Sequence, residues 1–113
     1  MAAKRFGALD LTTINTDVVL MTGCTGWDST VNVRFTNRTS GLVKVRLAYV
    51  PFPLATAVAN LVDADYLEFD VEVLPNCVLE NTGLALPPDN SFVVRTDTAG
   101  VSVVAYGWEE ELV

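Results

Sequence analysis

The side chains of this chain that could do chemistry are mostly carboxylates, and they are densest between residues 63 and 72. The acids of this stretch are Asp63, Asp65, Glu68, Asp70 and Glu72. Calcium takes about six to eight oxygen ligands from such residues, so a cation site is one interpretation. The stretch lacks the glycine turn and the terminal glutamate of an EF-hand, and three of its acids alternate with apolar residues. We favour a solvated or salt-bridged strand face and predict no metal.

Nucleophilic catalysis lacks its usual base, because the chain contains no histidine. None of the serines lies in a nucleophile-elbow pattern; they are Ser29, Ser40, Ser91 and Ser102. Lys4 lies near the start of the chain and Lys44 on the polar side of a strand pattern, so neither is expected to be desolvated. We predict that the protein is not an enzyme and uses no cofactor.

Two further features of the sequence have a chemical and a structural interpretation. Cys24 and Cys77 are far apart and lack the short spacings of metal sites, so we expect buried or bystander thiols, with a cross-link as the alternative.

Asn37-Arg38-Thr39 matches a glycosylation sequon. Turn formation is the simpler role, because Asn and Ser side chains hydrogen-bond their own backbone in turns.

Aromatic and basic side chains are the remaining candidates, as contacts to a partner protein. Trp27 follows a glycine-rich stretch, Phe52 lies between two prolines, and Trp108 precedes the acidic end of the chain. Aromatic side chains in loops bring large contact areas at low entropic cost, although Trp108 could equally cap a core. With the basic start, the predicted contact residues are Lys4, Arg5, Phe6, Trp27, Phe52 and Trp108.

Length and composition indicate one domain that folds alone. The chain has 113 residues, half of them apolar. It contains no run of about 18 apolar residues and no apolar leader, so we expect neither membrane insertion nor secretion, and synthesis in a cytoplasm.

Charge is distributed unevenly along the chain. Residues 1–46 contain six bases and three acids, whereas the remainder contains one base and eleven acids. This polarity suggests complementary contacts, between the strands of one copy or between copies. The net charge of −7 argues against nucleic acid as a partner.

The elements that must position these residues are strands. Residues 29–50 alternate apolar and polar side chains on both sides of a polar break, which predicts a β-hairpin with a four- or five-residue loop. Residues 66–73 alternate again, which predicts a core face made by Leu67, Phe69, Val71 and Val73. The predicted strands are 4–12, 17–23, 31–36, 43–49, 66–74, 78–86, 91–97 and 101–110, the first being either an edge strand or an extended arm.

About eight short strands at this spacing predict an all-β fold, an antiparallel sandwich of the jelly-roll or immunoglobulin-like kind. Residues 51–62 contain two prolines and an alanine-rich stretch, which predicts a Pro-rich or short helical crossover. We expect a single domain over residues 1–113, with residues 1–9 as a possible N-terminal arm.

The order of these segments resembles a group of small virion structural proteins of tailed bacteriophages. The resemblance rests on KRFGALDLT, VNVRFTNRTSGLVKVRLAYV, ADYLEFDVEVLPNCVLENTGLAL and GVSVVAYGWEE, and it omits chiefly residues 51–62. It implies a β-sandwich that works by binding other virion subunits, with no active site to transfer.

We therefore expect a capsid decoration or cement protein, located in the virion, that binds neighbouring capsid subunits and associates with itself. Its ends and the loop around Phe52 would contact adjacent subunits. The alternatives are a tail, baseplate, collar or fibre-associated subunit, and a carbohydrate- or receptor-binding module. For the last of these, Trp27-Asp28 offers the one compact pairing of an aromatic ring with a carboxylate.

Overall fold

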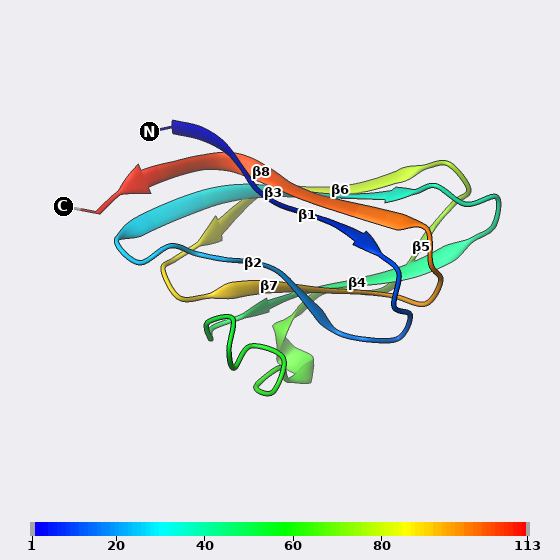
Figure 1. The fold of residues 1–113 in the computed structure, drawn as a ribbon, viewed down its shortest axis with the longest axis horizontal. Coiled ribbons are helices and arrows are strands. Elements are labelled where there is room, and N and C mark those ends of the chain that lie inside the picture. The colour runs from blue at the N-terminus through cyan, green and yellow to red at the C-terminus, as the bar shows by residue number, and fades with distance from the viewer. Residues whose placement is uncertain (1, 113) are drawn as a thin grey trace.

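The structure of the protein, a computed structural model, describes residues 2–112 and consists almost entirely of strands (Figure 1). Each predicted strand overlaps one of the observed strands, so the predicted all-β architecture is confirmed. The strands are β1 (Ala2–Leu11), β2 (Val18–Thr22), β3 (Trp27–Asn37), β4 (Val43–Val50), β5 (Tyr66–Val73), β6 (Val78–Leu86), β7 (Ser91–Thr96) and β8 (Val101–Glu111). A three-residue 3-10 helix, η1 (Asp63–Asp65), precedes β5.

Two antiparallel four-stranded sheets stack face to face, one in the order β1-β8-β3-β6 and the other in the order β2-β7-β4-β5. The first strand pairs with the last, the second with the seventh, the third with the sixth and the fourth with the fifth. Such nested pairing arises when one long hairpin is rolled up, and it is the strand order of a jelly roll. The immunoglobulin order, in which the first two strands pair with each other, does not occur in residues 2–112.

The predicted hairpin over residues 29–50 is wrong, although both of its strands exist. β3 pairs with β6 and β8 in one sheet, whereas β4 pairs with β5 and β7 in the other. Alternating side chains indicate that one face of a strand is buried, but they do not identify the strand that pairs with it. Here the apolar sides of β3 and β4 meet across the core, where Val33, Phe35, Val45 and Leu47 are fully buried.

The side chain of Asn37 fixes the passage from β3 to β4. Asn37 is fully buried, and its Nδ2 donates to the carbonyl oxygens of Gly41, Val73 and Leu74 at 2.8, 3.0 and 3.1 Å. Its Oδ1 accepts from the backbone N–H of Thr39 at 2.9 Å. The predicted turn-forming role of this residue is confirmed, and the side chain also ties the turn to the end of β5.

The predicted core face of residues 66–73 is wrong for its first half. Val73 is buried, but Phe69 is 54% exposed and Leu67 is 45% exposed. β5 is an edge strand, and its pairing with β4 slips between Val45 and Leu47. Within the slipped stretch Asp70 has a φ of 50°, which places the backbone in the left-handed region and reverses the alternation.

All four edge strands carry such an irregularity. The register shifts in the β1–β8, β2–β7, β3–β6 and β4–β5 pairs, each of which includes one edge strand. The two pairs between central strands, β3–β8 and β4–β7, run without a shift. Bulges on edge strands hinder pairing with another chain, so the regular part of each sheet lies at its centre.

Residues 51–65 fold over the outer face of the β2-β7-β4-β5 sheet, below the lower sheet in Figure 1. They join two antiparallel neighbours, β4 and β5, rather than crossing between sheets. Backbone N–H groups of Ala57 and Asn60 donate to the carbonyls of Pro53 and Thr56, so the predicted helical turns are present. Ala57 is fully buried. This covering segment, residues 51–65, builds a second apolar cluster with Ala48, Val50 and Val93.

The start of the chain is an edge strand rather than a projecting arm. β1 pairs with β8 from Ala2, opposite Glu109, to Leu11, opposite Val101. Both ends of the chain therefore lie at the same end of the molecule (Figure 1). No helix in residues 2–112 is long and apolar enough to cross a membrane.

Candidate interaction surface

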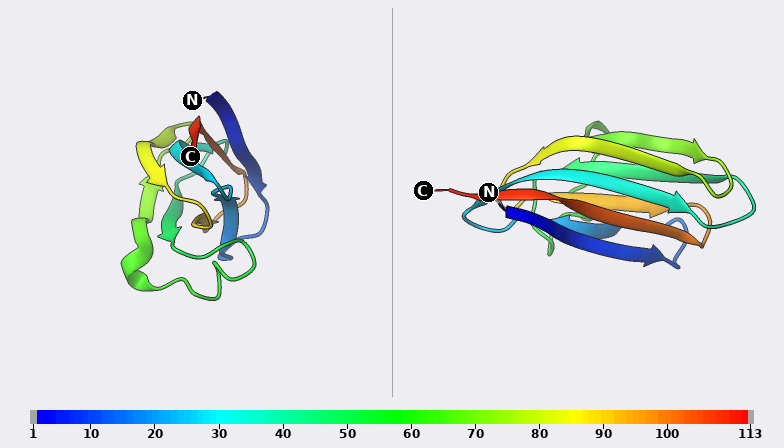
Figure 2. Two further views of the ribbon diagram at one scale, coloured as in Figure 1. Left: turned by 90° about the vertical axis from the view of Figure 1, so that its left-hand side faces the viewer. Right: turned by 90° about the horizontal axis from the view of Figure 1, so that it is seen from above.

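The outer face of the β1-β8-β3-β6 sheet is covered by no other segment of residues 2–112, as Figure 2 shows from above. On β8, Val101, Val103 and Ala105 are buried in the core, so the residues between them point outward. We call this surface the open face. Its centre is formed by Asp28, Thr30, Asn32 and Arg34 of β3 and by Val104, Tyr106, Trp108 and Glu110 of β8.

The register of β3 and β8 arranges the open face in rows across the sheet. Asp28 is opposite Glu110, and Thr30 is opposite Trp108. Further along the strands, Asn32 is opposite Tyr106 and Arg34 is opposite Val104. The face is therefore acidic at one end, aromatic in the middle and basic at the other end.

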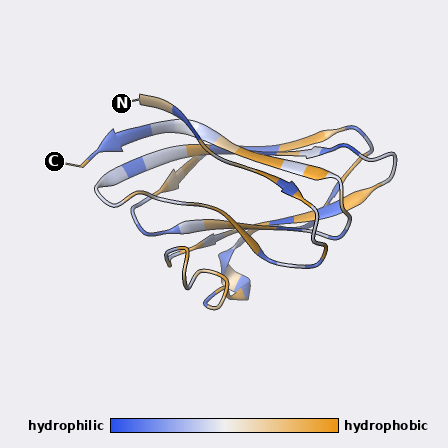
Figure 3. Ribbon diagram, viewed as in Figure 1, coloured by the Kyte–Doolittle hydropathy of each residue, from blue (hydrophilic) through white to orange (hydrophobic). Residues whose placement is uncertain are grey.

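The acidic end lies beside the chain termini, where Figure 3 shows a hydrophilic end of β8. Asp28 and Glu110 are exposed, and neither forms an ion pair within residues 2–112. Like charges directly opposite each other on a sheet are unfavourable. A hollow of about 350 Å³ adjoins them, lined also by Thr30, Ala85 and Pro87. This end is suited to a cationic group.

The aromatic middle presents Trp108, whose exposed fraction is 46%. Tyr106 is half-buried, and its hydroxyl donates to Oε2 of Glu80 on β6 at 2.9 Å. The hydrogen bond to Glu80 is the main reason that the pKa of Tyr106 is raised above its usual value of 10.0. Because the phenol is tied to β6, the ring of Tyr106 is held in a fixed position on the face.

The basic end is formed by Arg34, with Arg5 on the neighbouring strand β1. Arg34 lies opposite Val104 on one side and Glu80 on the other, and Arg5 lies opposite Tyr106. Both guanidinium groups belong to exposed residues and form no ion pair within the described chain. They are therefore available to a partner.

Of the residues predicted to contact a partner, Arg5 and Trp108 lie on the open face. Lys4 and Phe6 do not, because they fall on the other side of β1 or in its bulge. Lys4 Nζ lies 3.5 Å from Glu109 and 5.7 Å from the centre of the Phe6 ring, and Phe6 packs against the core. This ion pair joins the basic first part of the chain to its acidic last part, so one predicted charge contact is made within a single copy.

Trp27 and Phe52 lie elsewhere. Trp27 starts β3 opposite Glu111, and the alternation of the strand places it on the other side from Asp28. The predicted pairing of Trp27 with Asp28 therefore does not form a common site. Phe52 is 39% exposed in the covering segment, where its carbonyl accepts from the buried Ser91.

The sequence prediction missed Asp28, Arg34, Tyr106 and Glu110 as members of one surface. The spacing of two between Tyr106, Trp108 and Glu110 contains part of this signal, since such residues share a face of a strand. The rest of the signal is the pairing of β3 with β8, which brings together residues about 75 positions apart in the sequence. Local spacing does not reveal such a pairing.

A second exposed cluster lies on β5, at the edge of the other sheet. The Arg46 guanidinium contacts Asp70 with Nε–Oδ1 and Nη2–Oδ2 distances of 2.7 and 3.3 Å, and it lies 4.0 Å from the Phe69 ring centre. The Phe69 ring meets Tyr66 edge to face. The hydrogen bond to Arg46 is the main cause that lowers the pKa of Asp70. Because Arg46 and Asp70 pair with each other, this cluster presents no unpaired charge of these two residues to a partner, unlike the open face.

The acids of residues 63–72, which suggested a cation site, do not gather at one place, and two of them have different partners within the chain. Asp65 accepts from the backbone N–H of Val62, and Asp70 is paired with Arg46. Among residues 2–112, no group of three acidic, cysteine or histidine side chains converges as metal ligands would. Both cysteines are exposed and unpaired, Cys24 after β2 and Cys77 before β6.

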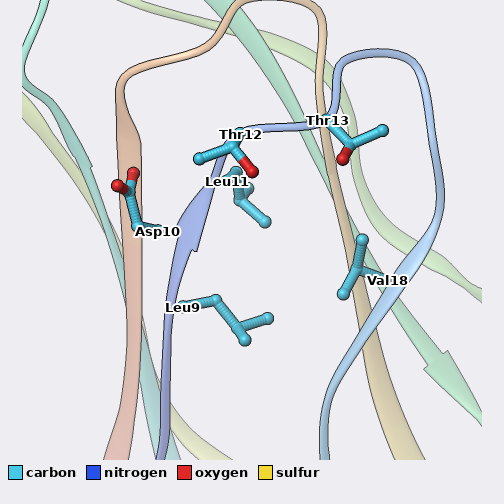
Figure 4. A pocket seen from close by; sticks show the side chains of 6 residues that line it. All are labelled: Leu9, Asp10, Leu11, Thr12, Thr13 and Val18. Carbon is cyan, nitrogen blue, oxygen red and sulfur yellow. The ribbon is translucent and has the colours of Figure 1, made fainter.

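A smaller hollow of about 140 Å³ lies between the end of β1 and the start of β2 (Figure 4). Leu9, Leu11 and Val18 line it together with Thr12 and Thr13. The carboxylate of Asp10 lies on the other side of β1 and is paired with Arg38. The hollow therefore offers two hydroxyl groups and apolar walls, and the one acid that lines it, Asp10, is paired with Arg38.

No protein-family model, no curated protein and no solved structure matches this chain significantly.

Proposed function

We propose that this protein is a non-enzymatic structural subunit of a tailed-bacteriophage virion, a decoration protein that binds neighbouring subunits of the capsid. The observation that supports it best is the open face, a regular sheet surface with an exposed tryptophan and unpaired charges at both ends. Tryptophan, tyrosine and arginine are the residues that dominate the energy of protein interfaces. The resemblance of the segments to small virion proteins of tailed bacteriophages suggests that the partner is another virion subunit.

The jelly-roll strand order agrees with this role, because viral capsid domains include many jelly rolls. Lectin domains also have this fold, so the analogy carries little weight by itself. The proposed binding role therefore rests on the open face, with its exposed Trp108 and its unpaired charges. Among the described residues, no nucleophile lies paired with a base on this face.

The proposal is tested with phage particles made from the genome that encodes this chain, with and without its gene. Mass spectrometry of purified wild-type particles should find the protein, and purified protein should rebind to the deficient particles. Regular extra density on the head lattice in cryo-electron microscopy would support capsid decoration. Density at the tail, baseplate or collar would support a tail subunit instead, and absence from purified particles would refute the proposal.

A matched pair of variants tests the contact surface. Trp108→Ala removes the exposed ring of the open face, and Phe69→Ala removes a ring of similar exposure from the other sheet. We expect the first variant to bind deficient particles at least about 10-fold more weakly and the second to bind normally. Equal losses in both variants would contradict the open face as the contact.

Carbohydrate binding is the second candidate, favoured by the neighbouring Trp108, Asp28 and Glu110 beside the hollow. An aromatic ring can stack on a sugar while carboxylates accept bonds from its hydroxyl groups. A glycan array distinguishes the two functions. Binding that depends on Trp108 would favour the carbohydrate module, whereas a silent array would count against it.

A further inference from the structure

The outward residues of the open face form two series with a common midpoint. Along β3 the series is Asp28, Thr30, Asn32 and Arg34, and its centre is Val31. Along β8 the series is Glu110, Trp108, Tyr106 and Val104, and its centre is Gly107. Val31 and Gly107 are directly paired across the two strands. A single line across the sheet therefore bisects both series.

A twofold axis along this line would place the open face of a second copy on that of the first. Such an axis reverses the strand direction and keeps each strand over its own counterpart. Asp28 of one copy then faces Arg34 of the other, and Trp108 faces Tyr106. Both contacts occur twice, as an isologous interface requires. We propose that the protein forms a homodimer by stacking its open faces about this axis.

Charge selects this arrangement over its alternatives. Each copy has a net charge of −7, so two copies repel unless opposite charges are brought close. A twofold axis parallel to the strands would keep the strand direction and exchange β3 and β8, so that Asp28 of one copy would face Glu110 of the other, four unpaired carboxylates together. The proposed axis places the acidic end on Arg34 instead. Complementary charges of this kind fix orientation and exclude wrong partners more than they add affinity.

The aromatic middle would provide the anchor. Trp108 is half exposed in the isolated chain, and Tyr106 is held by Glu80, so little side-chain entropy would be lost at the centre of the interface. Val31 and Gly107, through which the axis passes, both belong to the inward series of their strands, so no outward side chain lies on the axis itself. Ridges from the two faces could therefore approach to the roughly 10 Å separation of packed sheets.

The size of the face predicts a dimer of modest affinity. Four strands at ~4.8 Å and seven residues at ~3.3 Å give about 440 Å² in projection for each copy. The total for two copies is about 880 Å² in projection, slightly below the roughly 1,000 Å² of stable interfaces, so we expect a dissociation constant on the order of micromolar or weaker. The covering segment lies on the far sheet and does not obstruct the contact.

Sedimentation equilibrium and light scattering of the purified chain, between about 1 µM and 500 µM, test the dimer. We expect a concentration-dependent dimer that Asp28→Arg and Arg34→Asp each weaken at least about 10-fold, because each places like charges opposite each other. The double variant exchanges the two charges and should return to within about 3-fold of the wild type. Asp63→Arg, with the same change of charge in the covering segment, should leave the dimer unchanged.

Circular dichroism and urea midpoints show whether each variant is folded. A wild-type chain that is monomeric at 500 µM would overturn the dimer, as would a folded double variant that remains as weak as the single ones. This inference rests on the proposed function, which assigns the open face to the capsid contact: a copy cannot use this face for a second copy and for the capsid at once, so the dimer is the form of the free protein and dissociates when the capsid is bound. The two proposals nevertheless fail separately. A monomer that decorates particles would refute only the dimer, and a dimer absent from particles would refute only the virion role.

Discussion

The two sheets of this sandwich differ in what lies on their outer faces. The strands of the β2-β7-β4-β5 sheet have five to eight residues, and the covering segment adds a third layer of apolar contacts. The strands of the β1-β8-β3-β6 sheet have nine to eleven residues, and their outer face has no cover within residues 2–112. The shorter sheet buries part of its outer face beneath the covering segment, whereas the outer face of the longer sheet stays available for contact.

The largest effect on the free energy of unfolding should appear when an aspartate is placed, in two separate variants, on the outer face of each sheet. Val93 on β7 is 2% exposed beneath the covering segment, and Val104 on β8 lies half-buried on the open face. We expect Val93→Asp to lower the free energy of unfolding by about 3 kcal/mol or more, because it buries an unpaired carboxylate. Val104→Asp should cost about 1 kcal/mol or less. Urea unfolding near 1 µM protein measures both, and equal losses would mean that the two faces do not differ.

The next effect concerns how closely the central strands of the longer sheet approach. A Cβ at Gly107 would lie 2.0 Å from the carbonyl oxygen of Thr30 on β3. Gly107→Ala must therefore push β3 and β8 apart, at a cost of about 2–3 kcal/mol in thermal or urea unfolding. Gly41→Ala is the control, since a Cβ there meets no atom within 4 Å. An unchanged Gly107 variant would show that this sheet tolerates separation of its central pair.

A smaller effect should come from thinning the third layer. Leu61 packs against the cluster under the covering segment, and the adjacent Val62 is 57% exposed. Leu61→Ala should destabilise the fold by about 1–2 kcal/mol through lost apolar contact. Val62→Ala should stay within about 0.5 kcal/mol of the wild type. If both variants unfolded at the wild-type midpoint, the segment would be a loop resting on the sheet without stabilising it.

The smallest effect should come from the exposed ion pair between Arg46 and Asp70. Since Arg46 lowers the pKa of Asp70 below its usual value of 3.8, the pair stabilises the fold above this pH and ceases to do so as the pH falls through the lowered pKa. Asp70→Asn keeps a residue that tolerates the positive φ. Its urea midpoint should be slightly below that of the wild type at pH 7, and the difference should shrink as the pH falls below 3.8 and the carboxylate of the wild type takes up its proton. A difference that does not depend on pH would have another cause.

The sequence predicted the strands well, because each buries one side and alternates accordingly. It misassigned the pairing of residues 29–50, because Val33 and Val45 indicate only that their sides are apolar and not which sheet each strand joins. It also misplaced Phe69, because one left-handed residue, Asp70, reverses the alternation, and no pattern in an edge strand predicts this reversal.

The candidate surface was predictable only in part. Trp108 and Arg5 could be singled out by type and by position near the ends of the chain. Asp28 and Arg34 became relevant only once β3 was known to lie beside β8. Contacts between distant segments determine such a surface, and local periodicity contains little information about them.

The irregular register of all four edge strands restricts how copies of this chain can accumulate before they are used. Sideways addition of strand to strand would give a fibre without a natural limit. A twofold stack of open faces, in contrast, is complete at two copies. With the proposed dimer, a cell in which this protein accumulates would therefore hold separate pairs of copies instead of an aggregate that must first be dissolved.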